Sequence, residues 1–152
     1  MEIRSGSGYP SSALSNFAPH NFVFDNIKVN SLEGILQALK FDNIEMQEYV
    51  CSLVGIKAKM KGKNKNWQRT QTLYWQGKPI NRHSEEYQDL ITRIYDECAK
   101  QNQSFRKALV ASGDAVLTHS IGRNNSSETI LTRQEFCSRL TKLREKINKG
   151  LL

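Results

Sequence analysis

The sequence lacks any long apolar run. No segment approaches the ~18 consecutive apolar residues that a membrane-spanning helix needs, and Met1 to Arg4 do not open an apolar signal region. Hydrophobic residues make up 38% of the chain, and the mean hydropathy is -0.57. These absences argue against a membrane-bound or secreted protein, so the sequence predicts a cytoplasmic protein with no membrane partner.

Cysteine and histidine are both scarce. The three cysteines are far apart and each lies within a helical pattern: Cys51, Cys98 and Cys137. Such an odd, scattered set is typical of buried thiols in a reduced compartment rather than of disulfides. The three histidines are isolated and share no metal-ligand spacing with a cysteine: His20, His83 and His119. The sequence therefore predicts no metal site and no cofactor.

No internal repeat, low-complexity tract or linker divides the chain. Its 152 residues are enough to bury a core, so we expect one domain, packed over residues 9–147 and frayed over residues 148–152. Hydrophobic periodicity and turn residues predict mainly helices with a few short strands, which is an α+β fold dominated by α-helix.

The predicted elements begin after a Gly/Ser-rich loop at residues 4–12. Helices are expected at residues 31–41, from Asp42 or Asn43 to Gly55, and at 66–74, 84–98, 104–111 and 132–147, and strands at 22–24, 27–29 and 115–120. Thr132 to Glu135 is a capping box, and it gives the last helix a well-defined start.

The segment Ser31–Phe41 predicts an amphipathic helix with two distinct faces. Four apolar residues recur at i, i+3, i+4 and i+7: Leu32, Ile35, Leu36 and Leu39. Glu33, Gln37 and Lys40 share another face, so a carboxylate, an amide and an amine project the same way. Ser31 is a suitable N-cap, and it places Glu33 in the first turn, where helix N–H groups favour negative charge. From residue types alone, a solvated face with an exposed charge pair is the alternative.

Positive charge is in excess, with a net charge of +7. Lysine occupies every second position over residues 57–65, and Trp67 and Arg69 follow. A basic stripe beside an aromatic residue can hold phosphates and stack a base, so we expect a nucleic acid or a phosphorylated metabolite as the partner. A solvated lysine surface explains the same pattern. Gly62 and the neighbouring asparagines predict that part of this stretch is a loop.

Three segments together resemble the NADAR superfamily, also called YbiA-like. They are Leu14–Phe17 (LSNF), the S-x-E-x-x-x-Q-x-x-K-F motif of residues 31–41, and Ser112–Ala115 followed by Leu117. The resemblance covers nearly the whole chain. Superfamily members are small, mostly helical domains that cleave N-glycosidic bonds. One branch acts on phosphorylated ribosylamino-pyrimidine intermediates of riboflavin synthesis, and another removes ADP-ribose from guanine in DNA.

The resemblance implies two catalytic residues, Glu33 and Lys40. Glu33 would stabilise positive charge near ribose C1 or activate water. Lys40 would hold phosphate, protonate the leaving group or, when deprotonated, form an imine with the ring-opened sugar. The residues expected to bind the substrate are Asn16, Phe17, Gln37, Trp67, Trp75 and Asp114. Core packing is the alternative for either tryptophan, and a turn role is the alternative for Asp114; His119 is expected to have no catalytic duty.

The chain departs from the superfamily pattern at two places. Gly34 and Ile35 stand where relatives often carry a histidine and an aromatic residue, and Gly62-Lys63 replaces a common Gly-Arg pair. The basic stretch and the lack of a fused reductase or deaminase domain favour an ADP-ribosylated nucleic acid as the substrate. Two further hypotheses remain: a glycosidase of phosphorylated riboflavin-pathway intermediates, and a non-catalytic module that binds ADP-ribose or a related nucleotide.

Overall fold

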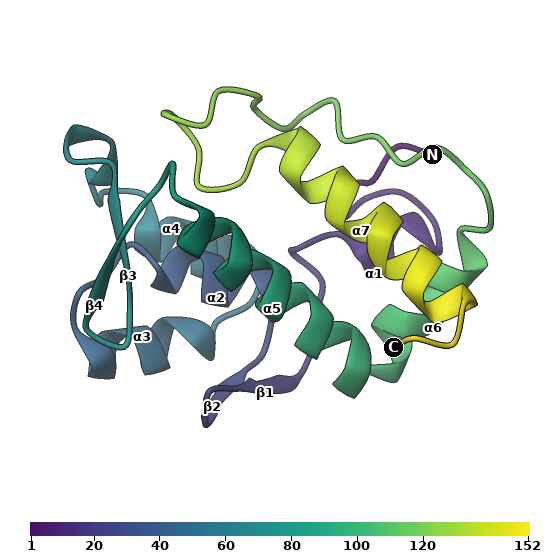
Figure 1. Ribbon diagram of the computed structural model, residues 1–152, viewed down its shortest axis with the longest axis horizontal. Coiled ribbons are helices and arrows are strands. Elements are labelled where there is room, and N and C mark those ends of the chain that lie inside the picture. Colours follow the sequence, from purple (N-terminus) through teal and green to yellow (C-terminus); the bar gives the residue numbers. More distant parts are fainter.

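Helices and two small hairpins surround one long helix in the computed structural model, which describes residues 1–152 (Figure 1). The elements in chain order are α1 (Ser11–Leu14), β1 (Phe22–Phe24), β2 (Ile27–Val29), α2 (Leu32–Ala38), α3 (Ile44–Cys51), α4 (Ile56–Gly62), the 3-10 turn η1 (Trp67–Arg69), β3 (Thr72–Trp75), β4 (Lys78–Asn81), α5 (Glu85–Gln101), α6 (Gln103–Ala111) and α7 (Arg133–Asn148). Both sheets have two strands. The predicted mainly helical α+β fold is confirmed.

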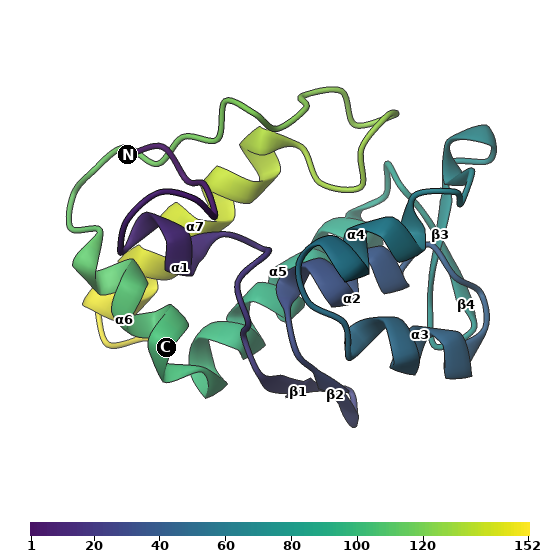
Figure 2. The same ribbon diagram turned by 180° about the vertical axis from the view of Figure 1, so that it is seen from behind.

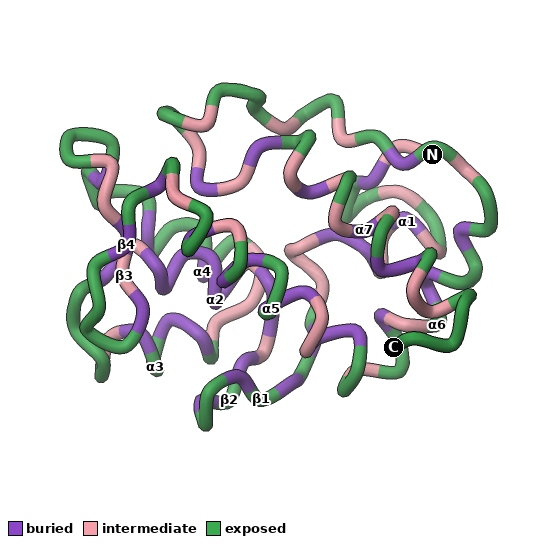
Figure 3. The backbone as a smooth tube through the Cα atoms, viewed as in Figure 1, coloured by how far each residue is buried: buried purple, intermediate pink, exposed green.

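The long helix α5 lies at the centre of the core. Its predicted apolar stripe is fully buried: Tyr87, Leu90, Ile91, Ile94, Tyr95 and Cys98. The Ser84 side chain caps its start by accepting a hydrogen bond from the Tyr87 N–H. The helix contacts β1, β4, α6 and α7, and 33 buried hydrophobic residues form one continuous core around it. Figure 3 shows the buried backbone running through the interior, with exposed residues at the hairpin tips and outer loops.

The helix α2 is buried on almost every side. Ser31 caps it as predicted, because its hydroxyl accepts from the Gly34 N–H, and six of its seven residues are buried. Gly34 permits a close approach to the end of α3. A Cβ at this position would lie 2.7 Å from the carbonyl oxygen of Leu53 and 2.9 Å from that of Val50. The position therefore has no room for a side chain, which accounts for one departure from the superfamily pattern.

The first hairpin is confirmed, and a second one was not predicted. In the first, Phe22 pairs with Val29, and the turn residues Asp25 and Asn26 have φ of 46° and 67°, as a type I′ turn requires. The helix expected at residues 66–74 is wrong. The chain there forms η1 and then β3, which pairs with β4 through a positive-φ turn at residues 76–77. The feature that indicates a strand is the alternation in β3, whose side chains are buried at every second position.

Three smaller expectations also need correction. The run at residues 115–120 forms no strand, because it makes a single parallel bridge, between Glu2 and Thr118. The loop expected at residues 4–12 contains the start of α1 at Ser11. The helix α3 ends at Cys51, and Gly55, with φ of 61°, precedes α4 instead of ending α3.

Both ends of the chain pack more than expected. Ile3 is fully buried in the core, and Leu152 packs partly against it. The Leu151 N–H donates to the carbonyl of Lys146 at 2.8 Å. The packed part therefore extends beyond residues 9–147 on both sides. No helix has the length and apolar content that crossing a membrane requires.

Candidate functional site

A cavity of about 540 Å³ opens beside the polar face of α2. Its walls come from residues 15–17, α2, α4 with η1, and the start of α7. Residues 119–132, which we call the roof loop, close it from above. In Figure 1 this loop arches over the top of the molecule, and Figure 2 shows α4 lying against α2 from behind. The cavity is large enough for a nucleotide-sized ligand, since small-molecule sites typically span about 300 to 1,000 Å³.

The polar stripe of α2 forms one wall of this cavity. Gln37 Nε2 donates to Glu33 Oε2 at 2.7 Å, and Lys40 Nζ donates to the carbonyl oxygen of Gly62 at 3.4 Å. Gly62 lets α4 cover the stripe, because a Cβ there would lie 2.0 Å from Gln37 Oε1. Gln37 Oε1 itself is buried without a hydrogen-bond partner. The three predicted side chains therefore meet at a covered wall rather than on a solvated surface.

Burial moves the pKa values of both ionisable groups on this wall toward neutrality. Desolvation raises the pKa of Glu33, although the Gln37 hydrogen bond and the charges of Lys40 and Lys59 oppose the rise. Desolvation also lowers the pKa of Lys40, against the attraction of Glu33. A carboxylate that protonates more readily and an amine that deprotonates more readily are the groups that proton-transfer chemistry uses.

Asn16 is held next to Glu33 by two hydrogen bonds. Its carbonyl oxygen accepts from the Glu33 N–H at 3.0 Å, and its Oδ1 accepts from the Tyr95 hydroxyl at 2.7 Å. Because Oδ1 is already bonded, the Nδ2 group remains as the donor that the amide can offer to a ligand. The LSNF segment therefore reaches the site through both its backbone and its side chain.

Cationic side chains outnumber acidic ones around the cavity. The cationic residues are Arg4, Lys40, Lys59, Lys63 and Arg123, and the acidic ones are Glu33 and Glu128. Three aromatic residues also line it: Trp67, Phe136 and Phe17, whose ring centroid lies 5.9 Å from Lys59 Nζ. An excess of positive charge beside aromatic faces suits a ligand that carries both phosphate and a base.

The cavity brings together six of the eight predicted site residues: Asn16, Phe17, Glu33, Gln37, Lys40 and Trp67. Trp75 lies outside it. The indole Nε1 of Trp75 donates to Asp25 Oδ2 at 2.8 Å and its ring packs on Phe24, so it joins the two hairpins. Asp114 also lies outside, exposed in the turn after α6. For both residues the structure places the side chain where the alternative interpretation, core packing or a turn, expected it.

Comparison with known proteins identifies the family of this chain. The family model described as bacteriophage protein GP30.3 matches residues 8–145. The chain belongs to this family. It is also 43% identical over 151 residues to the 17.1 kDa protein in the Gp30-rIII intergenic region of Enterobacteria phage T4, covering 97% of this chain and 98% of that protein.

The fold of this GP30.3 family member is that of YbiA. The NMR structure of the E. coli protein YbiA matches with a TM-score of 0.65 and 18% identity, covering 99% of this chain and 85% of that one. The YbiA-like fold expected from the three sequence segments is therefore confirmed.

The Ser112–Ala115 segment has a structural role in this member of the GP30.3 family. Arg144, which is buried in α7, donates to the Ser112 hydroxyl and to the Ala115 carbonyl, both at 2.9 Å. Gly113 adopts a φ of 59° to make the turn. The segment thus fixes to α7 the stretch of chain that immediately precedes the roof loop.

His119 lines the cavity, although the sequence predicted no catalytic role for it. Its Nδ1 lies 2.8 Å from the carbonyl oxygen of Ile3, and its ring packs edge-on against Phe136 at 5.1 Å between centroids. Because a carbonyl can only accept, Nδ1 carries the proton, and Nε2 is left free to exchange one. The pattern of residues 115–120 does not indicate that His119 lines a cavity, because its contact with Ile3 joins residues 116 positions apart.

Arg4 and Arg123 are cavity residues that the sequence did not single out either. Each lies in a segment that was expected to be loop, and tertiary packing alone brings them to the same rim. No group of three or more histidine, cysteine, aspartate or glutamate side chains in the structure is arranged to hold a metal ion.

Proposed function

We propose that this protein is an N-glycosidase that hydrolyses the bond between ribose C1 and an exocyclic amine, and that it removes ADP-ribose from guanine in DNA. One observation carries the proposal: Glu33, a half-buried carboxylate, and Lys40, an amine with a lowered pKa, line the same wall of a cation-rich cavity. The YbiA-like fold supports the same reaction class, because N-glycosidases of the NADAR superfamily share it.

The charges on the α2 wall suit the two ends of a breaking C1–N bond. Positive charge develops on the ribose ring, and Glu33 can stabilise it or take a proton from the attacking water. Negative charge develops on the departing amine, and Lys40 can protonate it. With its lowered pKa, Lys40 can also act as a neutral amine toward the ring-opened sugar. Gln37, bonded to Glu33, holds the carboxylate in place.

His119 completes the set of proton-carrying groups. It lines the cavity and contributes to the electrostatic field that acts on Glu33. With Nδ1 committed to Ile3, its Nε2 can give a proton to the leaving base or take one from water. We propose this role in addition to the structural one expected from the sequence.

The remaining cavity residues suit the rest of an ADP-ribosyl group. Lys59, Lys63 and Arg123 are placed to neutralise a diphosphate, because all three line the cavity and none forms an ion pair within the chain. Trp67 and Phe17 offer aromatic faces to a base. The free thiols of the buried cysteines suit action in the reducing cytoplasm.

A non-catalytic nucleotide-binding module is less well supported. Such a module gains nothing from a carboxylate that faces its anionic ligand, and desolvating Glu33 costs free energy of folding whenever it is charged. A phosphorylated riboflavin-pathway intermediate has the same bond and also carries phosphate, so it is the alternative substrate within the proposed reaction class.

The test follows base release by mass spectrometry from an oligonucleotide with ADP-ribosylated guanine and, separately, from a phosphorylated ribosylamino-pyrimidine. We expect release from the oligonucleotide, and Glu33→Gln should lower its rate by roughly 10²- to 10⁴-fold. The rate should fall in acid at a pH above 4.5, because the raised pKa of Glu33 leaves it protonated and neutral there.

The matched control is Glu128→Gln, which removes the other carboxylate of the cavity and should leave the rate nearly unchanged. Full activity of a folded Glu33→Gln protein would refute the assigned role. Tight binding of both substrates without turnover would refute the enzyme itself and favour the binding module.

A further inference from the structure

The lysines of α4 lie in two rows, and only one of them faces the cavity. Lys59 and Lys63, four residues apart, line the cavity wall. Lys57 and Lys61, also four apart, lie on the opposite flank, because the buried positions of α4 fall between the two pairs. Lys65 follows in the turn after α4, with its Nζ 4.8 Å from the ring centroid of Phe41. We call Lys57, Lys61 and Lys65 the outer lysine row.

The positive charge of the whole protein is concentrated in this part of the chain. Residues 49–84 contain eight of the 22 basic residues and no aspartate or glutamate, which leaves 14 basic residues against all 15 acidic ones elsewhere. Nothing in the fold neutralises the outer lysine row, because no ion pair of the structure involves it. Glu45 and Glu48 are exposed on the neighbouring α3 but do not pair with these lysines. Unpaired lysines are the groups that release counterions from a polyanion.

Apolar and aromatic side chains are exposed between and beside the lysines. Tyr49 is 52% exposed, and Lys61 Nζ lies 5.5 Å from its ring centroid. Ile56 and Met60, on the outward side of α4, are 60% and 54% exposed. An exposed tyrosine held beside a cation is a platform on which an unpaired base can stack. A duplex keeps its base faces covered, so this mixture favours a single strand.

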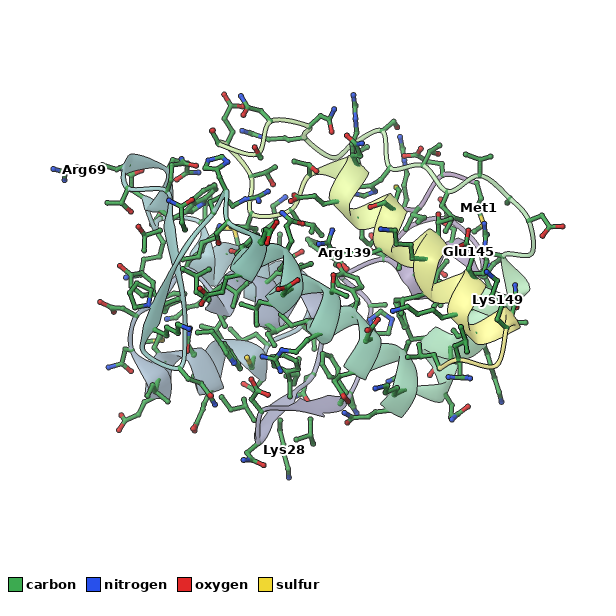
Figure 4. The ribbon with its side chains drawn as sticks, in the orientation of Figure 1. Met1, Lys28, Arg69, Arg139, Glu145 and Lys149 are labelled. Carbon is green, nitrogen blue, oxygen red and sulfur yellow. The ribbon has the colours of Figure 1, made fainter.

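We propose that the outer lysine row and Tyr49 form a docking surface for single-stranded nucleic acid. The strand crosses α4, so that one nucleotide can enter the cavity beside Lys59 and Lys63 while its neighbours contact the outer lysine row. Arg69, four residues after Lys65, projects from η1 into solvent and adds a further exposed cation (Figure 4). This inference rests on the proposed function only for the identity of the nucleotide that enters the cavity, since docking of the strand does not require a glycosidic bond to be cleaved.

The test measures binding of an unmodified oligothymidylate of about 15 nucleotides by fluorescence anisotropy, from about 50 to 200 mM salt. The triple variant Lys57→Gln, Lys61→Gln, Lys65→Gln should flatten the dependence of log Kd on log salt by about 2, since each single-strand phosphate contact contributes about 0.7. Tyr49→Ala should weaken binding by about tenfold without changing that slope, because stacking releases no counterions.

The matched control is Lys28→Gln, Lys107→Gln, Lys149→Gln, which removes the same charge from exposed lysines without ion pairs. Lys28 projects from the first hairpin and Lys149 lies at the far end of α7 (Figure 4). The control should keep the wild-type slope. An equal loss in both triple variants would overturn the docking surface, as would unchanged binding in the outer-row variant. Tighter binding of duplex with no effect of Tyr49→Ala would overturn the single-strand assignment. Because no base is released, these outcomes are independent of those for the proposed glycosidase.

Discussion

At the scale of single residues, the site depends on hydrogen bonds that leave one atom of each group available. Tyr95 occupies one end of the Asn16 amide, Gln37 occupies one oxygen of Glu33, and Ile3 occupies one nitrogen of a histidine ring. In each case the partner is fixed by the fold, and the residue itself lines the cavity. Such preorganisation limits the reorientation that a ligand must induce.

The role of His119 can be separated from its packing by a conservative change. His119→Asn can keep the side-chain donor to Ile3 while removing Nε2, so the fold should survive and the rate of base release should fall by about 10²-fold or more. KM should change little, because the lost nitrogen is proposed to transfer a proton and not to bind the substrate. Added imidazole should restore part of the rate. A variant with the wild-type rate would show that the ring only packs on Phe136.

At the scale of elements, the approach of α2 to its neighbours decides where Glu33 lies. Two glycines make this possible: Gly34, against the end of α3, and Gly62, against Gln37. Helix propensity alone disfavours both positions, since glycine costs about 1 kcal/mol relative to alanine within a helix. Their presence is explained by backbone contact rather than by local conformation.

Gly34→Ala should destabilise the protein although alanine is the better helix former. The new Cβ would meet the carbonyl oxygens of Leu53 and Val50 at 2.7 and 2.9 Å, and backbone atoms cannot move aside as a flexible side chain can. Overpacking costs about 1 to 3 kcal/mol, and two contacts under 3.0 Å with backbone oxygens put the cost here above the propensity gain of about 1 kcal/mol. Urea denaturation measures the change. Gly8→Ala, which has no atom within 4 Å of its Cβ, should be neutral, and equal stability of the two variants would contradict the packing argument.

At the scale of the whole molecule, one buried ion pair links the second hairpin to α7 and supports the roof loop. Arg82, 1% exposed, donates to both oxygens of Glu135 and to the carbonyl oxygen of Thr129 in the roof loop. The same carboxylate completes the capping box of α7. Burial acts to raise the pKa of Glu135, but the hydrogen bonds from Arg82, Thr132 and Gln88 outweigh it and hold that pKa below its ordinary value.

Stability should therefore fall in acid through this pair. A carboxyl group with a lowered pKa in the folded state stabilises the fold above its ordinary value of 4.5, and the contribution is lost as the pH falls toward the folded pKa. Glu135→Gln should lose about 3 kcal/mol at pH 7, because Arg82 is left buried without its charge partner. Its Tm should converge with that of the wild type as the pH falls below 4.5. Asp89→Asn, at an exposed carboxylate without an ion pair, should show the wild-type pH dependence. Parallel curves for Glu135→Gln and the wild type would contradict the assignment.

The sequence by itself determined the local features of this protein. Caps at Ser31, Ser84 and Thr132, the I′ turn of the first hairpin and the two faces of α2 all follow from contacts between residues a few positions apart. The polar stripe was recognised because one helical period brings Glu33, Gln37 and Lys40 to the same side. Such short-range rules hold whatever the rest of the chain does.

Only the tertiary structure decided which of these groups share a cavity. It placed His119, Arg4 and Arg123 there and directed Trp75 and Asp114 elsewhere. Residues 66–74, expected to be a helix, form η1 and the first strand of a hairpin. Pairing with β4 satisfies the hydrogen bonds of the β3 backbone, and the local pattern does not reveal that partner. Contacts between residues more than 100 positions apart depend on how all the elements pack at once, and no single segment encodes them.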